Sequence, residues 1–314
     1  MIAPVRQRGI ALITAILIVS LAVIAATAVL SASSLGIQRT STLQETEKAW
    51  WYAVGVEAWV KTILQRDAKN NKIDSLGDIW AQPVQALPVE QGFLSGEIVD
   101  LQGRLNLNNF AASDSARFTQ WQNVLIRLFE LLELEPSLAR PISEALRDWV
   151  DRDQSPTPYD GAEDNEYLSA VPPYRTANRP MQSVTELMAI KGVTPDIYKA
   201  LLPYVSALPQ IGTAINVNTA PEALVRALAV KPSAALEEFI RDRLEKPAEN
   251  TSELMSNGAL TGQDVETAMI STGSKFFQLR AQATIGSSRV AIYSLYYRAD
   301  SGEPLVIARS TDSE

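Results

Sequence analysis

The residues best suited to chemistry gather in one acidic segment, from Asp148 to Glu166. It holds seven carboxylates and a single basic residue, Arg152. Crowded carboxylates repel one another unless a cation neutralises them, and a hard divalent cation takes six to eight oxygen ligands. Because Pro156 and Gly161 interrupt the segment, we expect a loop. The composition predicts a calcium-type site, although a solvated acidic loop without metal accounts for the same residues.

The predicted ligands offer the oxygens that such cations prefer. For two ions they are four carboxylates, one backbone carbonyl and one amide oxygen, from Asp151, Asp153, Glu163, Asp164, Tyr167 and Asn178. Asp160 is suited to be a ligand or to form a turn. The segment is not an EF-hand, because Pro156 stands where that loop requires glycine and its twelfth position is Ala162.

Composition argues against most enzyme classes. The 314 residues include no cysteine and no histidine. Disulfides, thiol catalysis, Ser-His machinery and histidine-held zinc are therefore absent, and a metal must be bound by oxygen atoms. The net charge of −8 also makes the chain a poor partner for nucleic acid.

The flanking pattern predicts which elements position the acidic segment. A continuous helix is expected from Ile10 to about Ala68, strands near 94–108 and 275–310, and helices over most of the region between them. Leu105 and Leu107 alternate with polar residues as in a strand, Phe277 and Leu279 begin a second alternating run, and Pro83 and Pro88 break the chain before the first strand. Capping-box spacing at Ser183 and Glu186, and again at Thr219 and Glu222, predicts two helix starts, and a last short helix is expected near 262–270. We therefore predict an α+β fold with a long N-terminal helix packed on an antiparallel sheet and a large all-α domain inserted between the strands. The expected divisions are a leader over 1–9, a membrane half-helix over 10–37, a first α/β part over 38–111, the inserted domain over 112–272, and final strands with a tail over 273–314.

The N-terminus predicts a membrane span with a processing site. From Ile10 to Ile37 there is no charged residue, and about 20 residues suffice to cross a bilayer. Arg6 and Arg8 precede this run, which places the N-terminus in the cytoplasm. The junction at Gly9 resembles the cleavage site of type IV prepilins and type II secretion pseudopilins, which implies cleavage after Gly9 and methylation of Ile10. A secretory signal peptide and a plain membrane anchor are the simpler interpretations.

Six further motifs carry a resemblance that covers nearly the whole chain. Together they resemble the type II secretion system minor pseudopilin of the K class, the general secretion pathway protein K family. The motifs are Trp149-Val150-Asp151-x-Asp153, Asp160-Gly161-Ala162-Glu163-Asp164-x-x-Tyr167-Leu168, Pro172-Pro173-Tyr174-Arg175-x-Ala177-Asn178-x-Pro180, Ser183-Val184-x-Glu186-Leu187, Ile190-Lys191-Gly192 and Asn216-Val217-Asn218-Thr219-Ala220.

The resemblance implies a function without catalysis. It implies a pseudopilin α/β domain with a helical insertion, calcium in the acidic loop, and a place at the tip of the pseudopilus. The implied partners are the minor pseudopilins I and J, pseudopilin H, the major pseudopilin, prepilin peptidase and inner-membrane lipid of a Gram-negative cell, with the main body periplasmic. Most pilins carry glutamate at the fifth position of the mature chain, whereas that position here is Thr14. In lacking this glutamate the chain resembles the K class.

Two other functions compete with this interpretation. A helix-hairpin-helix-like stretch around Gly192 suggests a pilin-like protein that binds DNA during DNA uptake, although its second hairpin glycine is missing. A membrane-anchored hydrolase with paired carboxylates is the third hypothesis, but no nucleophile accompanies the acids.

Overall fold

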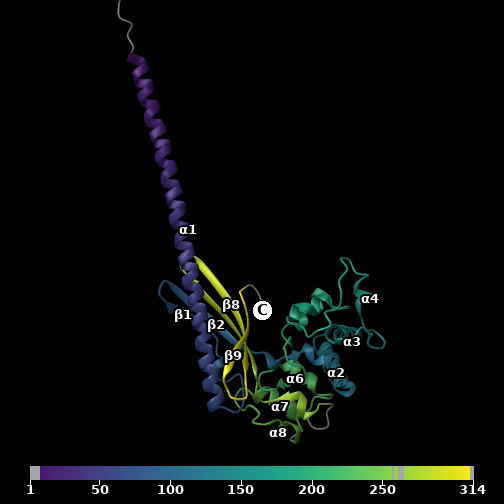
Figure 1. Cartoon of the computed structure of the whole chain (residues 1–314). Coiled ribbons are helices and arrows are strands. Elements are labelled where there is room, and N and C mark those ends of the chain that lie inside the picture. Colours follow the sequence, from purple (N-terminus) through teal and green to yellow (C-terminus); the bar gives the residue numbers. More distant parts are fainter. Residues whose placement is uncertain (1–7, 257, 261–264, 312–314) are drawn as a thin grey trace, which may run out of the picture.

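Helix α1, Arg8–Asn70, is the longest element of the chain and carries the rest of the molecule on its C-terminal half (Figure 1). The computed structural model describes residues 8–256, 258–260 and 265–311, so the first seven residues of the predicted leader lie outside it. The side chains from Ile10 to Ile37 are exposed, whereas Ala49, Ala53 and Leu64 are fully buried against the sheet. The predicted helix is confirmed.

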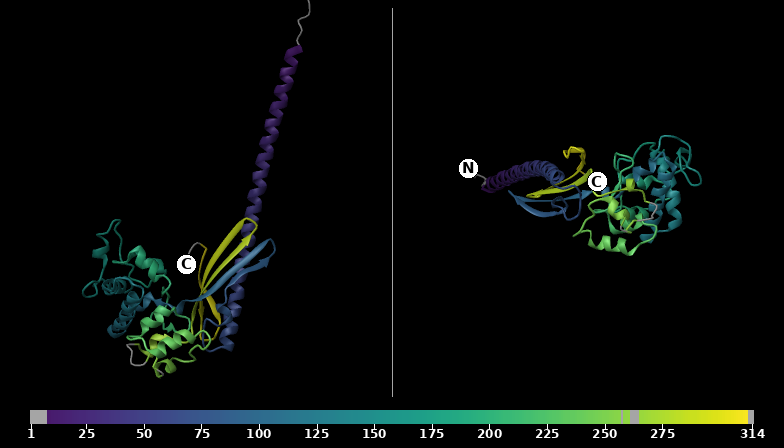
Figure 2. Two further views of the ribbon diagram at one scale, coloured as in Figure 1. Left: turned by 180° about the vertical axis from the view of Figure 1, so that it is seen from behind. Right: turned by 90° about the horizontal axis from the view of Figure 1, so that it is seen from below.

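Five strands form one antiparallel sheet in the order β1-β2-β7-β8-β9. Their bounds are β1 Val84–Val89, β2 Gly92–Asp100, β7 Phe276–Ile285, β8 Ser288–Arg298 and β9 Pro304–Ser310. Strand β7 alternates as predicted, with Phe277 and Leu279 buried towards α1. The sheet lies between α1 and the helical part (Figure 2).

The helical part is inserted between two neighbouring strands, because β2 pairs with β7 along its whole length, from Gly92↔Ile285 to Asp100↔Phe277. Its elements are η2 Leu101–Gly103, β3 Leu105–Asn106, η3 Leu107–Ala111, α2 Ser115–Leu131, η4 Pro136–Leu138, α3 Ala139–Val150, α4 Asp164–Tyr167, η5 Val184–Ala189, α5 Pro195–Leu201, β4 Val205–Ser206, β5 Ile215–Asn216, α6 Glu222–Leu228, α7 Ala234–Asp242, α8 Thr251–Ser256, η6 Thr267–Met269 and β6 Ile270–Ser271. The predicted fold class is confirmed, with two short parallel strand pairs, β3-β4 and β5-β6, inside the helical part.

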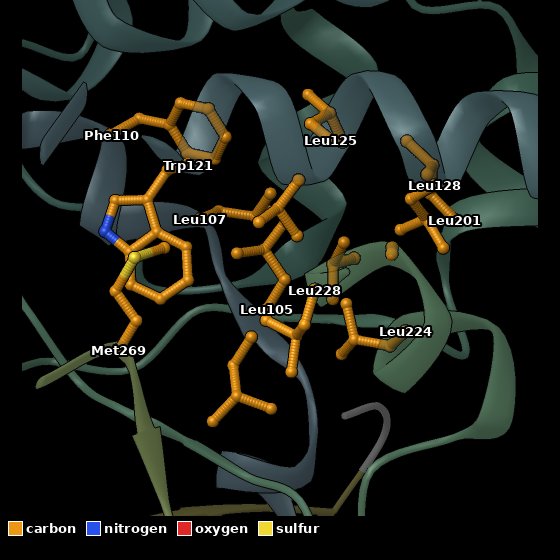
Figure 3. Close-up of a cluster of buried hydrophobic side chains, with 14 of the residues drawn as sticks. Leu105, Leu107, Phe110, Trp121, Leu125, Leu128, Leu201, Leu224, Leu228 and Met269 are labelled. Atoms are coloured by element: carbon orange, nitrogen blue, oxygen red, sulfur yellow. The ribbon is translucent and has the colours of Figure 1, made fainter. Parts of the chain in front are cut away.

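One apolar core holds this insertion together (Figure 3). Trp121, Leu125 and Leu128 repeat at helical spacing on α2 and point into the same cluster as Leu224 and Leu228 of α6, with Trp121 beside Met269. Core burial of this kind contributes about 25 cal/mol for each Å² of apolar surface removed from water.

Three local predictions were wrong. A strand over Leu105 and Leu107 was expected in the main sheet. Instead β3 covers only Leu105–Asn106 and pairs with β4, and Leu107 begins the 3-10 helix η3. Strand β1 was missed because its prolines suggested a break; an edge strand tolerates proline. Thr219 was expected to cap α6, yet its hydroxyl donates to Asp100. The helix expected over 262–270 falls partly outside the described residues, and its described end is η6.

A buried polar network joins the two parts. The Asn216 Nδ2 group of the helical part donates to the Asp74 carbonyl at 3.0 Å, Asp100 Oδ2 at 3.0 Å and Ser274 Oγ at 2.9 Å. The Asp100 carboxylate also accepts from Thr219 Oγ1 at 2.6 Å. Because buried polar groups need partners, this network fixes how the helical part meets the sheet.

Candidate metal centre

Three carboxylates converge where α3 gives way to the acidic loop. Ligand atoms of Asp151, Asp153 and Glu163 all lie within 4.8 Å of one another. Asp151 and Asp153 directly follow α3, and Glu163 immediately precedes α4. The loop therefore closes on itself and brings residues ten apart in sequence to one point.

Local turns explain why the two aspartates face the same point. Asp151 Oδ1 accepts from the Asp153 backbone N–H at 3.3 Å, and Asp153 Oδ1 accepts from the Ser155 N–H at 2.8 Å. Such contacts to the backbone two residues on are how aspartate stabilises a turn. Each of these turns uses one oxygen, Oδ1, of its carboxylate.

The electrostatics of the site oppose three simultaneous negative charges. Burial, with the nearby Asp148 and Asp151 carboxylates, raises the pKa of Glu163 to about 7. Burial, with the charges of Asp153 and Asp148, raises the pKa of Asp151 to about 6. A bound cation would reverse this effect, because it favours the charged carboxylates.

Unpartnered oxygens show that the residues fit such a cation. Both carboxylate oxygens of Glu163, a residue only 4% exposed, are buried and accept no hydrogen bond from the described residues. The Asn178 side-chain oxygen is likewise buried without a donor. Leaving buried acceptors unsatisfied is costly, and oxygen donors of this kind suit a hard cation.

The other predicted ligands lie outside the three-carboxylate group. Asp160 is exposed, and its backbone N–H donates to Glu144 Oε2 at 2.9 Å. Asp164 accepts from the Thr176 N–H and hydroxyl, each at 3.0 Å. The Tyr167 carbonyl accepts from two backbone N–H groups, at 3.2 and 3.3 Å. Their role as ligands stays a prediction.

Two carboxylates on α3 hold the loop, a role that the density of acidic residues in the sequence did not indicate. Glu144 is 3% exposed and Asp148 is fully buried. Their i, i+4 spacing on a helix whose Ile142, Leu146 and Trp149 point inward was the available signal, because charged residues on a buried face need partners.

The hairpin around Gly192 faces the acidic segment. Gly192 has φ +84° between η5 and α5. The Lys191 backbone N–H donates to the Tyr167 hydroxyl at 3.3 Å, and Lys191 Nζ pairs with Glu166 at 3.3 Å. These groups, which would approach a phosphate in a DNA-binding hairpin, contact the chain's own loop instead.

The N-terminal site residues lie on the free end of α1. Gly9 and Ile10 belong to its first turn, and Thr14 Oγ1 donates back to the carbonyls of Ile10 and Ala11 at 3.1 and 3.0 Å. Thr14 thus satisfies its hydroxyl within the helix. The helix from Ile10 is long and apolar enough to cross a membrane.

Comparison with known proteins gives one consistent family. A family model described as type II secretion system (T2SS), protein K, matches residues 103–210. Type II secretion system protein K of Aeromonas hydrophila is 32% identical, over 97% of each chain. That of Pseudomonas aeruginosa is 31% identical, over 96% of this chain and 92% of the relative. A similar solved structure is the GspK-GspI-GspJ complex from enterotoxigenic Escherichia coli, with TM-score 0.77 and 27% identity over 88% of this chain and 100% of the other.

Proposed function

The chain belongs to the type II secretion system protein K family, and from this premise we propose that it lies at the tip of the pseudopilus and starts pseudopilus assembly. It is a minor pseudopilin of type II secretion. The observation that carries the tip role is its similarity, over most of its length, to a chain solved together with two other pseudopilins, I and J. Pseudopilin H and the major pseudopilin are further expected neighbours in the pseudopilus.

The membrane end supports the same role. We propose that Ile10–Ile37 spans the inner membrane with the N-terminus cytoplasmic and the body periplasmic, because basic Arg6 and Arg8 flank the apolar run. Prepilin peptidase would cleave after Gly9 and methylate Ile10. Intact mass measured with and without the peptidase tests this; an uncleaved chain in its presence would contradict it.

An association experiment tests the tip role. The chain, mixed at micromolar concentration with pseudopilins I and J, should elute from gel filtration as one complex. A control with I and J alone gives the position of their pair. Elution of this chain apart from an intact I–J pair would count against the proposal.

The alternative of DNA binding in a DNA-uptake pilus gains no support from the hairpin. Its Lys191 is already paired with Glu166, and the net charge of the chain is −8. Binding to duplex DNA at low salt that weakens steeply as salt rises would favour this alternative.

We propose calcium as the cation of the acidic loop, in a structural and not a catalytic role. Asp151, Asp153 and Glu163 would hold one ion, with Asn178 among the ligands of this ion or a second one. Calcium supplies charge neutralisation and cross-links the two ends of the loop. The chain's own residues bring their oxygens together and bury Glu163.

Metal removal gives the direct test of the calcium site. Calcium should raise the melting temperature of the full chain in detergent, and chelator should reverse the gain, because ligands that bind only the folded state stabilise it. The double variant D153A/E163A should show no calcium response. As a control, D196A removes an exposed acid on α5, and this variant should keep the response. A wild-type melting curve that ignores both calcium and chelator would remove the calcium proposal.

A further inference from the structure

The acidic loop is hydrogen-bonded to two buried carboxylates of α3, Asp148 and Glu144, which do not belong to the three-carboxylate group. Asp148, on the last turn of α3, accepts from the Thr157 backbone N–H at 2.9 Å and from the Thr157 hydroxyl. One turn earlier, Glu144 Oε2 accepts from the Asp160 N–H at 2.9 Å. Together they fix the returning backbone of the loop at two points on one face of α3.

The third part of this attachment is a glycine with no room for a side chain. A Cβ atom on Gly161 would lie 2.3 Å from Asp148 Oδ2 and 2.4 Å from the Thr157 backbone nitrogen. The Gly161 N–H donates to the Thr157 carbonyl at 3.1 Å, which closes the turn from 157 to 161. Only glycine permits this approach of the backbone to the buried carboxylate.

Glu163 follows this turn by two residues. Its carboxylate oxygens are buried, accept no hydrogen bond from the part of the chain that the structure describes, and lie close to Asp151 and Asp153, which follow the end of α3 at Val150. Helix α3 therefore positions both parts of the three-carboxylate group. Asp151 and Asp153 are joined to it by the chain itself, and Glu163 is held near it by the contacts of Glu144 and Asp148 with the loop.

We propose that Asp148 and Glu144 are positioning residues for the metal centre. Asp148 acts through Thr157 and Gly161, and Glu144 acts through the Asp160 N–H, to set Glu163 against Asp151 and Asp153. This inference rests on the proposed calcium site. Removal of a group that orients a metal ligand commonly lowers metal affinity by about 10- to 100-fold. The hydroxyl of Thr157 is accordingly required for tight calcium binding, although Thr157 is not among the ligands proposed above.

Substitution of Thr157 separates positioning from folding. T157V removes only the hydroxyl, since its backbone N–H still reaches Asp148; T157S restores the hydroxyl. Thr119 on α2 donates to the Ser115 carbonyl at 2.9 Å, so T119V removes a hydroxyl contact far from the loop and serves as the matched control. G161A tests the close approach.

The experiment titrates calcium chloride into the metal-free full chain in detergent by calorimetry and records the melting of each metal-free variant. T157V should bind about tenfold more weakly than wild type, while T157S and T119V bind within about twofold. The metal-free melting of T157V should match that of T119V. G161A should bind at least as weakly as T157V.

The outcomes distinguish this proposal from the calcium site itself. If wild type binds calcium and T157V binds it equally well, the positioning role is wrong and the metal site stands. If T157V binds weakly but its metal-free form melts far below T119V, the contact serves folding and positioning is again wrong. If wild type gives no calcium binding, both proposals fall. If G161A does not fold, the Thr157 variants still decide.

Discussion

Asp100 ends β2, and its carboxyl group is buried where the sheet meets the helical part. It accepts hydrogen bonds from Ser274 Oγ at 2.6 Å, Thr219 Oγ1 at 2.6 Å and the Gln102 N–H at 2.8 Å. Burial nevertheless raises its pKa to about 6, from an ordinary value of 3.8. The folded chain therefore holds this proton more tightly than the unfolded chain does.

The raised pKa of Asp100 predicts a specific pH dependence of stability. Its contribution to the free energy of unfolding is fully present below about pH 4 and is lost as the pH rises to about 6. The stability of wild type relative to D100N should thus fall by about 3 kcal/mol over this range. Guanidinium unfolding at several pH values measures it, and a constant difference between the two proteins would contradict the assignment.

At the scale of single residues, composition located the acidic site but could not sort its members. Asp151, Asp153 and Glu163 were predicted ligands, and the structure brings them together. Asp148 belongs to the same acidic segment, yet its carboxylate is committed to Thr157. Which acid turns inward depends on the path of the loop, which a density of charges does not specify.

The packing of α1 on the sheet gives a prediction at the scale of elements. Ala53 lies on the face of α1 that packs on the sheet and is fully buried, whereas Ala58 on the same helix is exposed. A53L should destabilise the chain by about 1–3 kcal/mol, because extra volume cannot enter a packed interface. A58L should change the free energy of unfolding by less than about 0.5 kcal/mol. Thermal melting measures both, and equal effects would contradict this packing.

Elements with a strong local signal were predictable. The helix from Ile10 and the alternation of β7 follow directly from periodicity. The capping box of Ser183 and Glu186 is present as predicted, at the start of η5. The same spacing at Thr219 failed because tertiary contacts claimed the hydroxyl for Asp100. Local rules hold until a distant buried group competes for the same atom.

At the scale of the whole molecule, the chain order alone implied a helical region between strands of one sheet. The order of those strands did not follow, because antiparallel neighbours are set by contacts between residues far apart in sequence. The Asn216 network is of the same kind: it joins positions near 74, 100, 216 and 274. No short window of sequence contains such a junction.

The pairing of β2 with β7 has a consequence for how such chains can change. Asp100 and Phe277 are register partners, so the two ends of the insertion are attached to adjacent strands, only about 5 Å apart. The ladder that ends at this pair, from Gly92↔Ile285 to Asp100↔Phe277, forms without using the inserted residues. The inserted helical part could therefore be lengthened, shortened or exchanged in evolution while α1 and the five-stranded sheet keep their pairing. A filament subunit could in this way acquire a new surface domain without a change in the part that packs on its long helix.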